Sequence, residues 1–250
     1  MLQYITKGLF VAVAIKQHII TLEFEEEGEK VDRRKVAFVT GASRGIGRAC
    51  AISLAKAGYD VAVSARTMVD GTAYLDDGET PVPGGLDTTV ESINAAGREG
   101  LPIKMDLLDR QSVLQAADTA LNHFGRIDVL LNNAIYQGTG SMLTIEALED
   151  KYLKQLFEGN VFAQIALIRH LLPSFISQGG ATIVNMISAT AFTNPPGKIG
   201  SGGWGVGYAM TKSAFERIAP LLMIEHGEEG IVTYNIDPGH VVTERQKAKR

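Results

Sequence analysis

The chain has 250 residues, of which 45% are hydrophobic, and a formal net charge of -4 at pH 7. This length is sufficient for one domain with a sizeable buried core. The net charge is slightly negative, whereas binding to nucleic acid or to an anionic membrane requires a basic surface, so we expect neither partner. The single cysteine, Cys50, excludes an internal disulfide, and no paired Cys/His spacing predicts a metal site. A reducing, cytoplasmic setting fits this composition.

The first 34 residues stand apart from the pattern that follows, and we treat 1–34 as an N-terminal extension. Residues 8–15 are apolar and follow Lys7, as in a signal peptide, but the run ends at Lys16 without a convincing cleavage site. The run is also far shorter than the roughly 20 residues that span a bilayer. We expect no membrane span here but a short buried strand or helix.

From Lys35 onward, short β-branched runs alternate with longer amphipathic stretches, which predicts a parallel sheet with helices on both faces. The predicted strands are 36–40, 61–65, 101–105, 127–132, 181–187 and 231–236. The predicted helices are 46–57, 88–96, 111–124, 147–177 with a break near Pro173, and 206–226. This order indicates a Rossmann-type, doubly wound α/β fold in one domain, 35–250. The segments 70–87 and 190–205 are expected to be surface segments, and we assign no chemistry to 70–87.

A glycine-rich segment, residues 40–47 (TGASRGIG), joins the first strand to the first helix. The free N–H groups at such a helix N-terminus suit a pyrophosphate. Gly41 permits the tight turn, Gly45 lets the backbone approach the phosphates, and Gly47 allows close packing of helix on strand. The segment predicts a dinucleotide site, with an ordinary strand-to-helix turn as the alternative.

The spacing Gly-x-x-x-Gly-x-Gly resembles that of the classical short-chain dehydrogenases/reductases. Asp106 after the third strand resembles the family's aspartate near the adenine, and 132–134 resembles its Asn-Asn-Ala-Gly stretch under the cofactor. Ile135 replaces the expected glycine, which alters the backbone there without removing a reacting group. Segment 237–243 resembles the family's Pro-Gly-x-x-x-Thr beside the nicotinamide, with a simple Pro-Gly turn as the alternative. The cofactor contacts that the resemblance implies are Gly41, Ser43, Arg44, Gly45, Ile46, Gly47, Arg66, Asp106, Leu107, Asn133, Ala134, Tyr208, Lys212, Pro238, Gly239, Val241 and Thr243.

The choice of cofactor depends on the end of the second strand. An acidic residue there would bind the ribose 2′-hydroxyl and repel a 2′-phosphate, but Ala65 and Arg66 occupy that place. Arg44 in the glycine loop supplies a second guanidinium group for the same phosphate. Each arginine alone is typical of a surface charge, whereas the two together favour NADP(H) over NAD(H).

Tyr208 and Lys212 are four residues apart on a predicted helix, so their side chains lie on one face. With Asn160 and Ser188, they resemble in order and spacing the catalytic tetrad of the family. The resemblance implies Tyr208 as general acid/base and Ser188 as hydrogen-bond donor to the substrate oxygen. It also implies that Lys212 holds the nicotinamide ribose and that Asn160 anchors a water in the proton relay. The alternatives are a strand-end cap for Ser188 and a helix-kink residue for Asn160.

The reaction requires an acid poised near neutrality, because reducing a ketone delivers a hydride to carbon and a proton to oxygen. An unperturbed tyrosine has a pKa of about 10, and we expect the Lys212 cation to lower the pKa of Tyr208. The predicted function is an NADP(H)-dependent oxidoreductase that interconverts a carbonyl and a secondary alcohol, on a ketone, 3-oxoacyl or cyclic alcohol substrate. The alternative is a non-catalytic NADP-binding or scaffold protein of the same fold.

The two ends of the chain depart from the family pattern. Family members normally continue past Thr243 with a substrate lid, another helix and a last strand, and we expect 35–250 to lack that helix and strand. Ile20, Leu22 and Phe24 alternate with polar residues, as an added edge strand would. In the family the helices around Asn160 and Tyr208 pair between subunits, so a homodimer or homotetramer is expected.

Overall fold

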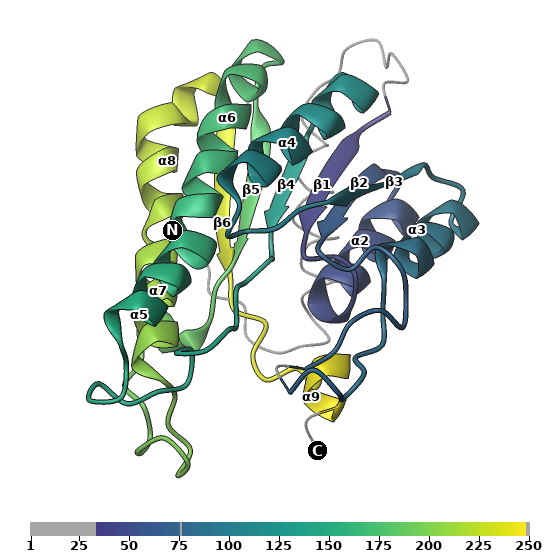
Figure 1. Cartoon of the computed structure of the whole chain (residues 1–250). Helices are drawn as coiled ribbons and strands as arrows, with labels where there is room; N and C mark the ends of the chain where they lie inside the picture. The colour runs from purple at the N-terminus through teal and green to yellow at the C-terminus, as the bar shows by residue number, and fades with distance from the viewer. Residues whose placement is uncertain (1–33, 76, 249–250) are drawn as a thin grey trace.

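The computed structural model describes residues 34–75 and 77–248. These residues form a parallel six-stranded sheet with helices on both faces (Figure 1). The strands are β1 (Val36–Thr40), β2 (Asp60–Ala65), β3 (Gly100–Lys104), β4 (Val129–Asn132), β5 (Ala181–Met186) and β6 (Ile231–Ile236). Their order is β3-β2-β1-β4-β5-β6, the doubly wound Rossmann order. The predicted fold is therefore confirmed.

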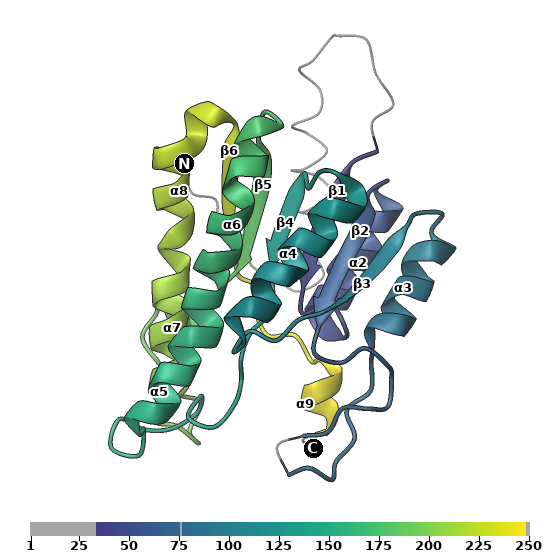
Figure 2. The ribbon, with the colours of Figure 1, turned by 45° about the horizontal axis from the view of Figure 1, so that its top comes forward.

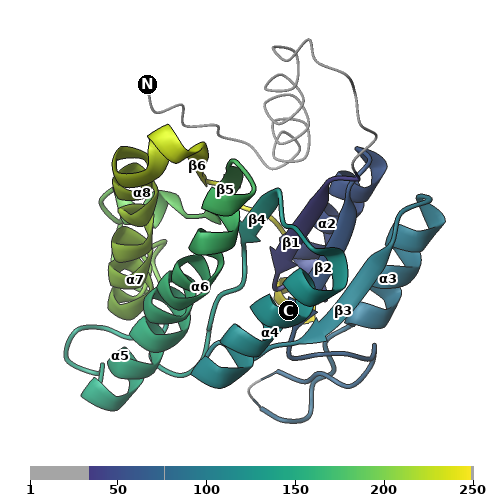
Figure 3. The ribbon, with the colours of Figure 1, turned by 90° about the horizontal axis from the view of Figure 1, so that it is seen from above.

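Two layers of helices bury the two faces of the sheet, as the view from above shows (Figure 3). One face packs against α2 (Gly45–Lys56) and α3 (Leu86–Ala95), and the other against α4 (Arg110–Phe124), α6 (Ala163–Ser177) and α8 (Ile218–His226). Phe38 and Val39, adjacent in β1, enter opposite clusters, because successive strand side chains point to opposite faces. Both faces are apolar, as a covered parallel sheet requires.

The predicted helix 147–177 is interrupted, but not where its proline stands. It consists of α5 (Asp150–Phe157), a π-helical turn (Glu158–Phe162) and α6, and Pro173 lies inside α6. The predicted break near Pro173 is therefore wrong. Within the π-helical turn, the side chain of Asn160 bonds the backbone of Tyr136. Single π-turns inside helices commonly accompany functional sites.

The predicted helix 206–226 is divided into α7 (Val206–Glu216) and α8. Pro220 explains the division, because proline has no N–H to donate to the carbonyl four residues earlier, that of Glu216. The side chain of Asn235 in β6 donates to this carbonyl instead, at 2.7 Å. A bond from the sheet thus replaces a bond of the helix. Figure 2 shows α7 lying beside α5 and α6.

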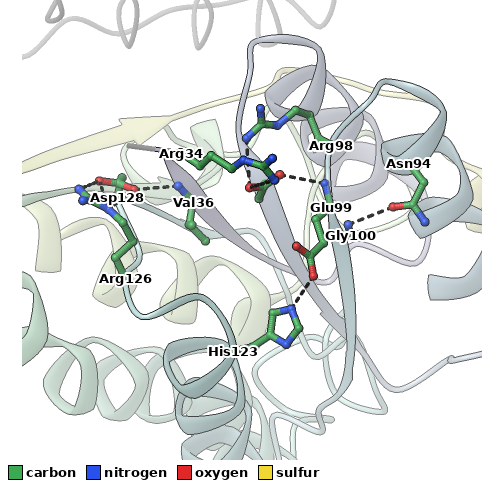
Figure 4. Close-up of polar contacts among 10 residues, drawn as sticks. Arg34, Val36, Asn94, Arg98, Glu99, Gly100, His123, Arg126 and Asp128 are labelled. Carbon is green, nitrogen blue, oxygen red and sulfur yellow. Dashed lines mark hydrogen bonds and ion pairs between the residues drawn. The ribbon is translucent and has the colours of Figure 1, made fainter. Parts of the chain in front are cut away.

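Polar contacts join the amino ends of the central strands (Figure 4). Asp60 at the start of β2 pairs with Arg98 at 3.1 Å and accepts from the backbone N–H of Glu99 at 2.9 Å. Asp128, ahead of β4, accepts from the N–H of Val36 at 2.7 Å. These contacts fasten β2 to β3 and β1 to β4 at the amino ends of the strands, and the carboxyl ends of the strands lie at the opposite end of the sheet.

Several shorter segments complete the described chain. Short 3₁₀ turns span Ala189–Ala191 and Gly227–Glu229, and α9 (Glu244–Ala248), which was not predicted, follows Thr243. No described helix is long and apolar enough to cross a membrane, and residues 34–75 and 77–248 contain no cluster of acidic, His and Cys residues that would hold a metal. The predictions for 8–15 and for an edge strand near Ile20 lie outside the described residues.

Candidate active site

The glycine loop has the local geometry that its sequence predicts. Gly41 and Gly45 have φ of 69° and 58°, in the left-handed region that favours glycine. A Cβ on Gly47 would lie 2.3 Å from the carbonyl oxygen of Gly41, which is too close for any other residue. The loop therefore turns tightly and brings the N-terminus of α2 against β1.

The segment 132–134 supports this loop from the neighbouring strand. The hydroxyl of Thr40 accepts from the backbone N–H groups of Asn133 and Ala134, each at 3.0 Å. The Asn133 amide donates to the Thr40 carbonyl at 2.9 Å. A Cβ on Gly41 would lie 2.8 Å from the Cα of Ala134. Loop and segment are thus one packed unit, and the half-buried Ile135 after it does not disrupt the contacts.

An acidic residue that the sequence analysis did not single out lies at the N-terminus of α2. A carboxylate oxygen of Glu244, at the start of α9, accepts from the backbone N–H of Gly45 at 2.9 Å. Thr243 packs on the same glycine. A helix N-terminus attracts anions, and here the anion is supplied by the chain itself. No local signal marks this contact, because the two residues are 199 positions apart.

The two arginines predicted to select the cofactor are close to one another. Arg66 is exposed after β2, and its charge acts on the guanidinium group of Arg44. Burial, followed by the charge of Arg245, lowers the pKa of Arg44. Arg44 donates to the carbonyls of Pro83 and Gly84, at 2.9 and 2.6 Å. The segment 70–87, to which the sequence analysis gave no role, therefore positions one member of the pair.

The other predicted cofactor residues also lie at the end of the sheet that the carboxyl ends of the strands form. Asp106 and Leu107 follow β3 next to the end of β2, where Met105 N–H bonds the Ala65 carbonyl at 3.0 Å. Asp106 also accepts from the N–H of Leu108 at 3.0 Å. Among the remaining residues, Ser43 and Pro238 are buried, and Ile46 and Val241 are half-buried. The predicted cofactor residues thus come from segments of the chain that are far apart in sequence.

The segment after β6 connects the two halves of the site. Gly239 has a φ of 67° and donates its N–H to the carboxylate of Asp237 at 3.0 Å. From this turn the chain runs to Thr243, which contacts Gly45 in the glycine loop. The segment 237–243 therefore lies between the glycine loop and the helix that carries Tyr208.

The four residues of the predicted tetrad come from three neighbouring elements. Ser188 follows β5, Tyr208 and Lys212 lie one turn apart in α7, and Asn160 is in the π-helical turn. The Ser188 hydroxyl lies near enough to the Tyr208 phenol to act on its pKa as a hydrogen-bond partner. The Asn160 amide donates to the hydroxyl of Thr211 at 3.4 Å, which links the π-turn to α7. The structure thus brings the tetrad to one place.

The side chain of Asn160 is occupied by the backbone beside it. Its oxygen accepts from the N–H of Tyr136 at 2.6 Å, and its nitrogen donates to the Tyr136 carbonyl at 3.1 Å. This geometry corresponds to the helix-kink interpretation. A role of Asn160 in holding a water stays a prediction.

The pKa of Tyr208 is shifted in the direction opposite to the one expected. Burial raises it, the hydrogen bond from Ser188 lowers it, and the carboxylate of Asp237 raises it further. The expected lowering by Lys212 does not contribute to this shift. The Lys212 ammonium donates to the carbonyl of Met186 at 2.6 Å. Lys212 is fully buried, and this burial lowers its pKa to about 8. Tyr208 is therefore a neutral phenol at pH 7, which is the form that donates a proton.

Comparison with known proteins identifies the family. The sequence model described as short chain dehydrogenase matches residues 35–250. Short chain dehydrogenase mpl6 of Monascus purpureus is 32% identical over 84% of this chain and 66% of its own. NADPH-dependent aldehyde reductase 1, chloroplastic, of Arabidopsis thaliana is 32% identical over 84% of this chain and 67% of its own. The chain belongs to the short-chain dehydrogenase family of oxidoreductases, and it spans about two thirds of the length of these relatives.

Solved structures support the same assignment. A short-chain dehydrogenase/reductase from Burkholderia xenovorans superposes with a TM-score of 0.72 at 27% identity, over 86% of this chain and 78% of that one. A metagenomic short-chain oxidoreductase, solved in complex with NADP, has a TM-score of 0.67 at 28% identity, over 83% of each chain.

Proposed function

We propose that the chain is an NADP(H)-dependent oxidoreductase that interconverts a carbonyl and a secondary alcohol. The observation that carries the proposal is the pairing of the Ser188 hydroxyl with the neutral phenol of Tyr208. A hydroxyl and a phenol side by side are suited to hydrogen-bond one carbonyl oxygen and to give it a proton. The substrate classes remain a ketone, a 3-oxoacyl compound or a cyclic alcohol.

The residues of the sheet edge fit a nicotinamide dinucleotide phosphate. A side chain at Gly47 would collide with the Gly41 carbonyl, so the glycine loop can hold its tight turn, and the N-terminus of α2 would direct its N–H groups to the pyrophosphate. Arg44 and Arg66 would hold the 2′-phosphate, and Lys212 would hold the nicotinamide ribose. The name of the Arabidopsis relative and the NADP complex of the metagenomic oxidoreductase support this choice.

In the direction of reduction, the nicotinamide cofactor would supply the hydride that the carbonyl carbon needs. Ser188 orients the carbonyl oxygen by a hydrogen bond. Tyr208 transfers its phenolic proton to that oxygen, and the phenolate recovers a proton from solvent. The Lys212 ammonium would stabilise the phenolate, together with the positive nicotinamide ring of the oxidised cofactor. In the reverse direction, the Tyr208 phenolate accepts the proton of the alcohol.

The proposal also covers the oligomeric state and the cellular location of the protein. Phe162 in the π-turn and Met210 in α7 expose 47% and 43% of their surface, and helices of this region would pair in a homodimer or homotetramer. The free, buried Cys50 is compatible with a reducing cytoplasm.

The test is a parallel titration with NADPH and NADH followed by a turnover screen. NADPH-selective binding, then NADPH oxidation with a ketone, is the expected result. Tyr208→Phe should reduce turnover by about 10² or more while binding is kept, and Tyr74→Phe, an exposed tyrosine in the 70–87 segment, is the matched control. Tight binding without turnover on any carbonyl would favour the alternative, a non-catalytic NADP-binding protein.

A further inference from the structure

A buried carboxylate follows the last strand beside the tetrad. Asp237 exposes 8% of its surface. One of its oxygens accepts from the N–H of Gly239 at 3.0 Å. Ile236 pairs with Met186 in the sheet, so Asp237 begins the turn after β6 where Ile187 and Ser188 continue β5. The mechanism proposed above assigns this carboxylate no role.

The contacts between β6 and the helices show what Asp237 faces. Thr233 donates to the carbonyl of Ala219 and Asn235 to that of Glu216, both at 2.7 Å. The helices therefore run antiparallel to the strand. The step from Asn235 to Asp237 covers about 6.6 Å along the strand direction. The step from Glu216 back to Lys212 covers about 6 Å along α7. Asp237 therefore lies opposite Lys212, as Asn235 lies opposite Glu216.

The side chains of 233, 235 and 237 point to the same face, because strand residues alternate. Asp237 is thus directed to the side of the sheet that α7 covers. Lys212 lies there with its ammonium on the carbonyl of Met186, the strand partner of Ile236. The Asp237 carboxylate and the Lys212 ammonium therefore both lie at the carboxyl ends of β5 and β6.

Among residues 34–75 and 77–248, Asp237 is the charged side chain that shifts the pKa values of Tyr208 and Lys212. Its carboxylate raises the pKa of both Tyr208 and Lys212. Neither α5, the π-turn nor the end of β5 brings another charge to bear on these two groups. Ser188 contributes a hydrogen bond but no charge.

We propose that Asp237 is a positioning residue that keeps Lys212 an ammonium and Tyr208 a protonated phenol, which favours proton donation to a carbonyl over proton removal from an alcohol. Burial alone drives an amine toward its neutral form, and a neutral Lys212 would not stabilise a developing phenolate. The Asp237 carboxylate opposes the loss of the positive charge on Lys212. It also opposes formation of the phenolate before substrate binds. The inference rests on the proposed function of Tyr208.

The test replaces the charge and keeps the hydrogen bond. Asp237→Asn retains an oxygen that can accept from Gly239 N–H, and Asp237→Ser is the second uncharged variant if the first does not fold. Asp118→Asn is the matched control, because it makes the same change of charge on the exposed face of α4, where Asp118 pairs with His170.

Two readings are taken from about pH 6 to about pH 10. The first is the rate of NADPH-driven reduction, and the second is the tyrosinate absorbance of each protein minus that of its Tyr208→Phe partner, without substrate. Removing the carboxylate should move both profiles to lower pH. The ratio of reduction rates at the alkaline and acid ends should fall about fivefold, and alcohol oxidation near neutral pH should rise. Asp118→Asn should leave both profiles unchanged.

Profiles of Asp237→Asn or Asp237→Ser that coincide with the wild type would overturn the inference. The absorbance reading separates this inference from the proposed function. If the wild type turns over no carbonyl, the proposed function fails, while a shifted phenol titration in the uncharged variants still supports the placement of Asp237. A general loss of rate at every pH, with unmoved titrations, would indicate a structural role only and would also overturn it.

Discussion

The carboxylate of Glu244 accepts a hydrogen bond from the backbone N–H of Gly45 at 2.9 Å. This N–H belongs to the helix terminus at which we propose that the pyrophosphate binds. A carboxylate and a pyrophosphate are both anions and cannot share one N–H group without repulsion. Cofactor binding is therefore expected to displace Glu244, and with it the start of α9.

Glu244→Gln should tighten NADPH binding. The glutamine oxygen can still accept from Gly45, but the competing negative charge is lost. Because a charge at a helix terminus contributes about 0.3–1 kcal/mol, the Kd for NADPH should fall by up to about fivefold, and the free energy of unfolding should fall by a similar energy. Fluorescence titration and chemical denaturation measure the two effects. Glu228→Gln, on an exposed 3₁₀ turn, is the control, and weaker or unchanged NADPH binding would contradict the competition.

Arg66→Ala should reduce the selectivity for NADPH. A hydrogen bond to a charged group is worth about 1.5–3 kcal/mol, so the Kd for NADPH should rise at least about tenfold while that for NADH changes little. Parallel fluorescence titrations with the two nucleotides measure the ratio. The control is Arg169→Ala, an exposed position of α6. Equal losses for both nucleotides would place Arg66 away from the 2′-phosphate.

The buried Lys212 should make stability depend on pH at the alkaline end. Its pKa is lowered from 10.5 to about 8, so between these values the unfolded chain binds more protons than the folded one. Stability from this group is therefore reduced below about pH 8 and is regained as pH rises toward 10.5. The free energy of unfolding of the wild type, minus that of Lys212→Met, should rise by roughly 3 kcal/mol over this window. Urea denaturation at both ends measures it, and parallel curves would show that the ammonium is not desolvated.

Asn235→Ala should weaken the attachment of α7 to the sheet. It removes the donor to the Glu216 carbonyl and leaves a polar atom without its partner, at a cost of about 1–3 kcal/mol. Thermal unfolding measures this loss, and turnover should fall as well because α7 carries Tyr208 and Lys212. Asn122→Ala, on the exposed face of α4, should leave both readings near the wild type. An Asn235→Ala protein with unchanged turnover would separate this bond from the geometry of the tetrad.

Hydrophobic periodicity predicted the sheet and its helices because it reports which side chains are buried. It did not locate the breaks inside the long helices, and the break at the π-turn depends on contacts across the fold. The π-turn at Asn160 accompanies bonds to Tyr136, while Pro173 is accommodated within α6. The division before α8 does have a local signal in Pro220, and only its partner Asn235 required the structure.

The candidate site was predictable where residues of one segment carry the geometry. The turns at Gly41 and Gly45 and the one-turn spacing of Tyr208 and Lys212 are of this kind. The role of Glu244 was not, because it meets Gly45 only through the fold. The sign of the Tyr208 pKa shift was also missed, since spacing shows a nearby cation but does not show burial.

The bond between Asn235 and Glu216 ties the reacting groups to the last described strand. Because Pro220 withholds the usual helical donor, the rotation and axial position of α7 are set by β6 as much as by the helix itself. Because the segment 237–243 continues β6, fraying of that strand would disturb the proposed proton-transfer groups and the proposed nicotinamide side of the nucleotide site together. Heating should accordingly abolish turnover and nucleotide binding over the same temperature range.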